Sequence, residues 1–99
     1  MNRIWIIDDE ESIRTICTSA LEDLFEVEAF ANASEALLEL NTTQPDLIIT
    51  DIKMPGMSGL EFLDKVSVKF PEIPTIIITA HANIDNALSA YKGGAFEYL

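Results

Sequence analysis

Four oxygen-bearing side chains follow or end three short apolar runs of the sequence. Asp8 and Asp9 follow the first run, Asp51 ends the second, and Thr79 ends the third. Two carboxylates ~4 Å apart repel by about 4 kcal/mol at an effective dielectric near ~20, so a fold that gathers three of them needs a cation. Hard carboxylate oxygens favour Mg²⁺ or a similar ion.

Phosphoryl transfer is the chemistry that these residue types support together. A Mg²⁺ ion held by Asp8 and Asp9 keeps several waters, which leaves room for a phosphoryl group beside it. Asp51 is then placed to attack phosphorus and become an aspartyl phosphate, while Thr79 offers a hydroxyl group. A single aspartate after a strand is more often a turn or helix cap, so the hypothesis depends on the fold bringing the run ends together.

The elements that must position these side chains alternate along the whole chain. Aliphatic and β-branched runs predict strands at residues 3–7, 26–30, 46–51, 75–79 and 95–99. Apolar residues at helical spacing predict four helices between them, with stripes at Ile13, Ile16, Cys17, Ala20, Leu21 and Leu24, and within residues 33–40, 62–70 and 84–91. Two pairs have the spacing of a helix N-cap and its partner, Asn32 with Glu35 and Ser58 with Glu61.

A parallel sheet follows from this order of elements. Strands separated by helices need crossover connections, and right-handed crossovers place helices on both faces. We expect an α/β fold of the flavodoxin-like, doubly wound type, with five strands in the order 2-1-3-4-5. In that order ligands gather at the carboxyl ends of the first and third strands, where Asp8, Asp9 and Asp51 stand. The acidic first loop disfavours a flavin or nucleotide pocket, which would use Gly, Ser or Thr there.

Composition indicates one domain with little attraction to nucleic acid or membranes. The 99 residues include 17 acidic and 6 basic side chains, and the net charge of −11 favours basic partners and divalent cations. Cys17 is the only cysteine, so no internal disulfide or cysteine-based zinc site is expected, and we interpret Cys17 and His81 as structural. The early acidic residues and the absence of a run near ~20 apolar residues predict a cytoplasmic protein.

A tight turn is predicted shortly after Asp51. Pro55 fixes φ and Gly56 accepts the positive φ that a type II turn requires. Such a turn is expected to hold the backbone beyond Asp51 and to direct the carbonyl of Lys53 towards the metal. A Pro-Gly pair alone is weak support, because any tight turn can use it.

Three of these motifs together resemble the receiver domain of bacterial two-component response regulators. They are Asp8-Asp9 after the first strand, the segment 51–59 (Asp-Ile-Lys-Met-Pro-Gly-Met-Ser-Gly), and Thr79-Ala80-His81. The resemblance covers the whole chain in the correct order and implies a CheY-like fold. Residues 78–81 and 90–99 look most like receivers of the nitrogen-regulation (NtrC-type) class of transcriptional activators.

The resemblance implies a role for each matched residue. Asp51 would accept a phosphoryl group from the phosphohistidine of a sensor histidine kinase, and Thr79 would hydrogen-bond its oxygen. Asp8 and Asp9 would bind Mg²⁺ together with Asp51 and the backbone carbonyl of Lys53. Tyr98 would be the aromatic side chain that switches with phosphorylation, which would change an output domain that controls transcription. Plain edge-strand packing is the alternative for Tyr98.

The chain departs from the family pattern at its end. The family has a lysine after the fifth strand, usually followed by proline, and then a final helix, whereas this sequence ends at Leu99. The lysine would pair with phosphorylated Asp51, and the helix would cover an apolar face of the sheet. We therefore expect residues 1–99 to be one receiver domain truncated before its C-terminal helix, with a tendency to form homodimers or swapped oligomers.

Two other classes of function stay open on the sequence alone. A Mg²⁺-dependent phosphatase of the aspartyl-phosphate type usually needs an acid two residues after its nucleophile, and Lys53 stands at that position. A degenerate receiver that serves only for interaction or dimerisation is favoured by the absent lysine and disfavoured by the complete set of three aspartates. We expect a signalling domain rather than an enzyme.

Overall fold

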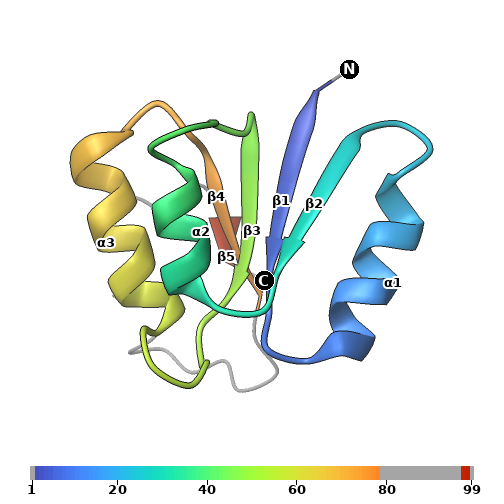
Figure 1. Cartoon of the computed structure of the whole chain (residues 1–99), viewed down its shortest axis with the longest axis horizontal. Helices are drawn as coiled ribbons and strands as arrows, with labels where there is room; N and C mark the ends of the chain where they lie inside the picture. The colour runs from blue at the N-terminus through green and yellow to red at the C-terminus, as the bar shows by residue number, and fades with distance from the viewer. Residues whose placement is uncertain (1, 79–96, 99) are drawn as a thin grey trace.

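A five-stranded parallel sheet in the order β2-β1-β3-β4-β5 forms the centre of the fold (Figure 1). The computed structural model describes residues 2–78 and 97–98. The predicted strand order and the flavodoxin-like class are confirmed. The strands are β1 (Arg3–Ile7), β2 (Glu26–Phe30), β3 (Leu47–Asp51), β4 (Thr75–Ile78) and β5 (Glu97–Tyr98).

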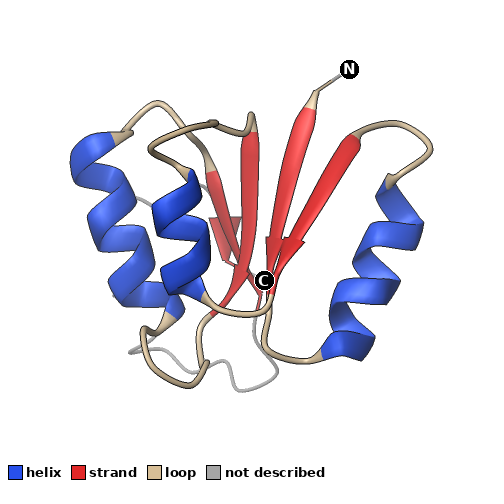
Figure 2. Cartoon of the chain, viewed as in Figure 1, coloured by secondary structure: helices blue, strands red, loops and turns tan. Residues whose placement is uncertain are grey.

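Helices cover both faces of the sheet, as right-handed crossovers require (Figure 2). Helix α1 (Glu11–Leu21) lies on one face, and α2 (Ala33–Glu39) and α3 (Gly59–Lys69) lie on the other. The helix predicted within residues 84–91 lies outside the described residues. None of the helices in the described part of the chain has the length and apolarity needed to cross a membrane.

Both predicted N-caps form in the structure. The side chain of Asn32 accepts a hydrogen bond of 2.9 Å from the backbone N–H of Glu35 at the start of α2. The hydroxyl of Ser58 accepts one of 3.1 Å from the N–H of Glu61 at the start of α3. Each cap satisfies a backbone donor that has no partner within the helix, and so fixes where the helix begins.

The main core lies between the sheet and helices α2 and α3. Trp5 is fully buried there, and its ring centroid lies 4.7 Å from that of Phe30. All apolar residues of β1 from Ile4 to Ile7 are buried, because β1 is an inner strand with neighbours on both sides. The remaining core side chains come from both helices and from strand β3, including Ala33, Ala36, Leu40, Ile48, Phe62 and Val66.

Helix α1 covers its face of the sheet with a stripe that is only partly buried. None of its side chains is buried, Cys17 is only half-buried, and Ile16 is 64% exposed. The helix ends at Leu21, so Leu24 lies beyond it and is 71% exposed. Within the described part of the chain no second helix packs beside α1.

Candidate functional site

The three predicted carboxylates meet at the carboxyl ends of β1 and β3. These strands are hydrogen-bonded neighbours, with Ile7 paired to Thr50, so the residues that follow β1 lie beside the end of β3. One carboxylate oxygen from each of Asp8, Asp9 and Asp51 lies within 4.8 Å of the others. The structure thus has the juxtaposition on which the metal-site hypothesis depended.

Asp8 is held in place by three hydrogen bonds. Its N–H donates to the carbonyl of Phe30 at 3.1 Å, which extends the sheet pairing by one residue. Its Oδ1 accepts a bond of 2.9 Å from the N–H of Glu10, and Nη1 of Arg14 donates to its backbone carbonyl at 2.8 Å. The carboxylate is therefore fixed by a local turn, and Arg14 binds the backbone carbonyl while its positive charge also lowers the pKa of the Asp8 carboxyl group.

Asp51 ends β3 and is fixed by the loop that follows it. Its Oδ1 accepts a 2.7 Å hydrogen bond from the N–H of Ile52, and the N–H of Lys53 also stabilises the charged carboxylate. Ile52 and Met54 are buried, whereas Lys53 between them is exposed. The loop is therefore anchored by two apolar side chains, in addition to the predicted turn at Gly56, whose φ is +78° as a type II turn requires.

Gly59 allows the first turn of α3 to lie directly against Asp51. Its N–H donates to the carbonyl of Ile52 at 2.7 Å. A Cβ atom at Gly59 would overlap the carbonyl oxygen of Asp51 and lie 3.0 Å from the Cα of Ile52. Only glycine fits this contact, so the residue sets the position of the Asp51 backbone.

Burial raises the pKa of both inner carboxyl groups above the ordinary 3.8. For Asp8 the burial effect is reinforced by the charges of Asp51 and Asp9 and opposed by the hydrogen bond from Glu10. For Asp51 burial is again the largest cause of the raised pKa. Hydrogen bonds from the N–H groups of Ile52 and Lys53 lower the pKa, whereas repulsion from the charges of Asp9 and Glu10 raises it further. The folded chain alone therefore holds these negative charges at a cost in free energy.

A divalent cation fits this donor set. The three carboxylates supply hard oxygen ligands, with Asp8 buried, Asp51 half-buried and Asp9 exposed, so the group opens to solvent on one side. In the described part of the chain the one salt bridge joins Arg3 and Glu26, so none of the three carboxylates is directly paired with a lysine or arginine there, and only the charge of Arg14 acts on Asp8 from a distance. Unpaired clustered carboxylates are the arrangement in which a bound Mg²⁺ ion lowers the energy most.

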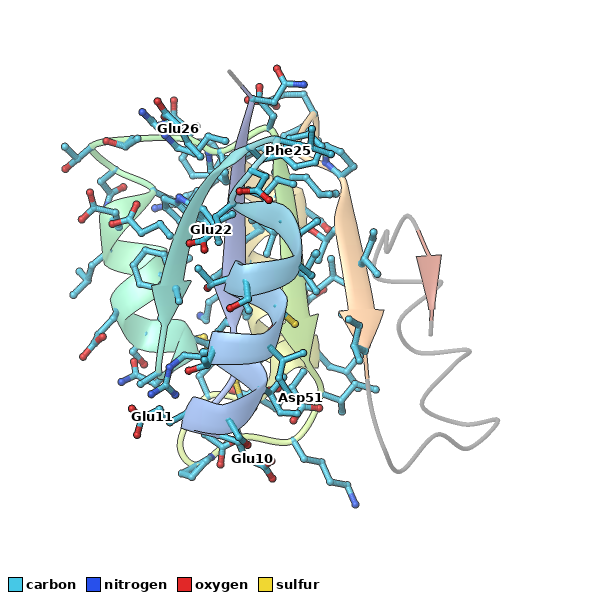
Figure 3. All side chains as sticks on the ribbon, turned by 90° about the vertical axis from the view of Figure 1, so that its right-hand side faces the viewer. Glu10, Glu11, Glu22, Phe25, Glu26 and Asp51 are labelled. Carbon is cyan, nitrogen blue, oxygen red and sulfur yellow. The ribbon has the colours of Figure 1, made fainter. Side chains whose placement is uncertain are left out.

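Glu10, Arg14 and Gly59 belong to the site but had no assigned role in the sequence. Figure 3 shows Glu10 at the same end of the molecule as Asp51, opposite the end that carries Glu26. Glu10 also adds repulsion to Asp51, and the acidic run at residues 8–11 was the signal that could have identified it. The contacts of Arg14 and Gly59 depend on how helices approach strand ends, which no local pattern reports.

Three residues named from the sequence are less fully described. Thr79 and His81 lie outside the described residues, although Ile78 pairs with Asp51 and so brings the end of β4 to this edge of the sheet. Tyr98 lies in β5 and pairs with Ile77 of β4. Cys17 is half-buried on α1, and burial followed by the charge of Asp8 raises the pKa of its thiol, which favours the protonated form.

Comparisons with known proteins point to one family of signalling domains. Residues 4–99 match the family described as the response regulator receiver domain. The chain is 44% identical over 96 residues to the DNA-binding transcriptional regulator NtrC of Klebsiella pneumoniae, and 42% identical over 97 residues to NtrC of Escherichia coli K12. These alignments cover 96% and 97% of this chain but only 20% and 21% of the relatives, so the chain spans about a fifth of their length.

Solved structures agree with this assignment over the entire chain. A response regulator receiver domain protein from Clostridium thermocellum superimposes with a TM-score of 0.91 at 39% identity, covering 100% of this chain and 81% of that one. The response regulator TrrA from Thermotoga maritima, solved in complex with Mg²⁺-BeF, gives a TM-score of 0.90 at 36% identity, with coverage of 100% and 85%.

Proposed function

Because the chain belongs to the response regulator receiver domain family, we propose that Asp51 accepts a phosphoryl group from the phosphohistidine of a sensor histidine kinase. The observation that carries this proposal is the gathering of three carboxylate oxygens within 4.8 Å at the ends of β1 and β3. Asp51 is the member of that group whose carboxylate is oriented by backbone N–H donors on its own loop.

The transfer needs one bond to form and one to break. A carboxylate oxygen of Asp51 attacks phosphorus, the phosphorus–nitrogen bond to the histidine breaks, and the imidazole leaves with the bonding pair and takes up a proton. When bound, Mg²⁺ neutralises the carboxylates and the phosphoryl oxygens. The chain's own contribution is to hold Asp51 still, through Ile52 and Gly59, and to keep one side of the site open.

The same family membership supports the proposed ligand set for Mg²⁺. Asp8, Asp9 and Asp51 supply carboxylate oxygens, and the backbone carbonyl of Lys53 is a further proposed ligand. The relative TrrA was solved with Mg²⁺-BeF, which is in keeping with a metal at this position of the fold. We propose that Thr79 hydrogen-bonds the phosphoryl group and that Tyr98 changes position with phosphorylation.

The whole protein is proposed to be a longer, cytoplasmic regulator in which residues 1–99 form the receiver. The NtrC relatives are about five times the length that the chain covers, and they are named as DNA-binding transcriptional regulators. We propose that the output controls transcription through another part of the protein. The net charge of −11 supports the proposal that the receiver itself does not contact DNA.

Phosphorylation by a small-molecule donor tests the assignment of Asp51. The full-length protein treated with acetyl phosphate and Mg²⁺ should gain the mass of one phosphoryl group, measured on the intact protein. Asp51→Asn should abolish the gain, and omission of Mg²⁺ should slow it by at least about a hundredfold, in line with the electrostatic contribution to phosphoryl transfer.

A matched variant separates loss of the acceptor from a general effect of charge. Asp23 lies exposed in the turn after α1, and Asp23→Asn removes the same charge away from the site. This variant should be phosphorylated as fast as the unaltered protein. A mass gain that persists in Asp51→Asn would show that another residue is the acceptor.

A further inference from the structure

Helices α2 and α3 enclose an apolar groove on the face of the sheet opposite α1. Its volume is about 640 Å³, and its floor and walls include Leu37, Met57 and Phe70. Figure 1 shows the two helices side by side on the same face of the sheet. The groove contains none of the three carboxylates of the candidate metal site, so the proposed phosphoryl transfer does not account for it.

Two large apolar side chains stand exposed on the opposite walls of this groove. Leu38 at the end of α2 is 71% exposed, and Val68 near the end of α3 is 81% exposed. Single exposed apolar residues are common on protein surfaces. Two of them facing one apolar groove form a continuous surface that an apolar partner can cover.

The charge at the groove is opposite in sign to that of the chain. Lys65 and Lys69 lie one helical turn apart on α3 and both line the groove, and Asp64 is the one acidic side chain among the described residues that line it. The chain as a whole has 17 acidic and 6 basic residues. A groove with two lysines and one aspartate in such a chain favours a partner that places acidic groups beside its apolar ones.

We propose that this groove binds an amphipathic helix of a partner protein, with its apolar face between Leu38 and Val68 and acidic side chains against Lys65 and Lys69. Helix-in-groove recognition uses apolar anchors at positions i, i+3 or i+4, and i+7. The eleven residues of α3 extend for about 16 Å at 1.5 Å per residue, which matches such a set of anchors.

A second copy of the chain is a poorer occupant for two reasons. A stable dimer buries about 800 Å² on each partner, with roughly 20–30 residues a side, whereas this groove presents only a few apolar side chains. Two copies would also bring together net charges of −11 each. A short helical segment needs less area and brings the acidic side chains that the lysines favour.

Two synthetic helical peptides of opposite charge test the proposal. Each has about 15 residues, long enough to form a helix, with leucines along one face, flanked by glutamates in the first peptide and by lysines in the second. Fluorescence anisotropy with labelled peptides gives the affinity of the chain for each. The acidic peptide should bind at least about tenfold more tightly than the basic one. In the Lys65→Glu/Lys69→Glu double variant this preference should reverse.

Two further variants locate the binding surface. Leu38→Ser/Val68→Ser should weaken binding of the acidic peptide by at least about tenfold, whereas Leu24→Ser, at another exposed leucine, should not change it. Tighter binding of the basic peptide to the unaltered chain would overturn the proposal, since the net charge alone predicts that result. Sedimentation that shows a dimer, reduced to a monomer by Leu38→Ser/Val68→Ser, would assign the groove to a second copy instead.

Discussion

At the scale of single residues, Asp51 is a side chain whose charged form the fold disfavours. Burial, together with the neighbouring charges of Asp9 and Glu10, raises its pKa above 3.8, even though two backbone N–H groups favour the charged form. A raised pKa means that the folded state binds protons more tightly than the unfolded state. Stability from this group is therefore greatest at low pH and is lost as pH rises from about 3.8 through the raised value.

Asp51→Asn is expected to stabilise the metal-free chain at neutral pH. The amide keeps the oxygen that accepts from Ile52 and removes the repelled charge, so the thermal midpoint at pH 7 should rise by about 2–6 °C. Well below pH 3.8 the difference should disappear, because Asp51 is then protonated in both the folded and the unfolded chain. Saturating Mg²⁺ should reverse the order, since the ion stabilises the charged form. Circular dichroism melts at several pH values would measure this, and a variant less stable at pH 7 without Mg²⁺ would contradict it.

Thr50 and Thr75 are buried threonines whose hydroxyl groups differ in hydrogen bonding. Both are 1% exposed, but Thr50 Oγ1 donates to the carbonyl of Asp51 at 3.1 Å, whereas Thr75 Oγ1 has no hydrogen-bond partner among residues 2–78 and 97–98. Thr75→Val should therefore leave the free energy of unfolding unchanged or raise it by about 1 kcal/mol, and Thr50→Val should lower it by about 1 kcal/mol. Urea unfolding followed by the fluorescence of Trp5 would measure both, and equal effects would mean that the Thr75 hydroxyl is bonded.

At the scale of elements, the contact between the start of α3 and the end of β3 positions the site. Gly59→Ala should lower the free energy of unfolding by about 1–3 kcal/mol, because a Cβ atom there overlaps the backbone of Asp51. The displaced carboxylate should also bind Mg²⁺ more weakly. Gly56→Ala is the control: its Cβ meets nothing within 4 Å, so only the positive φ costs free energy, about 1–2 kcal/mol. Gly56→Ala should weaken Mg²⁺ binding less than Gly59→Ala does, as calorimetry would show, because its Cβ does not displace Asp51.

The elements also show what the sequence could predict and what it could not. Alternating strand and helix patterns were enough to predict the strand order and to bring Asp8, Asp9 and Asp51 to one edge of the sheet. The caps at Asn32 and Ser58 were local signals and were confirmed. The exposure of Ile16 and Leu24 was not predicted, because the spacing of apolar residues reports a face but not how many neighbouring helices cover it.

At the scale of the whole molecule, the excess of negative charge opposes folding. Seventeen acidic side chains and six basic ones are confined to one small domain, and within its described part the only salt bridge is an exposed one between Arg3 and Glu26. An exposed pair of this kind contributes little. Repulsion between the remaining charges is therefore relieved mainly by ions in solution.

Salt should stabilise the chain for this reason. Raising NaCl from about 0.02 M to about 0.2 M shortens the screening length to below about 10 Å and should raise the thermal midpoint by a few degrees. MgCl₂ at equal ionic strength should raise it further, and Asp51→Asn should remove that extra rise but not the NaCl effect. A midpoint that falls with NaCl would show that attractive ion pairs dominate.

The open edge of β2 has a consequence for aggregation. A strand at the margin of a sheet offers unpaired backbone N–H and C=O groups to which another chain can add. Here that strand carries Glu26 and Glu28, both exposed and two residues apart. Identical chains meeting edge to edge would align these glutamates against one another. The margin is thereby protected from fibril-like stacking at neutral pH, and this protection should weaken once both glutamates are protonated.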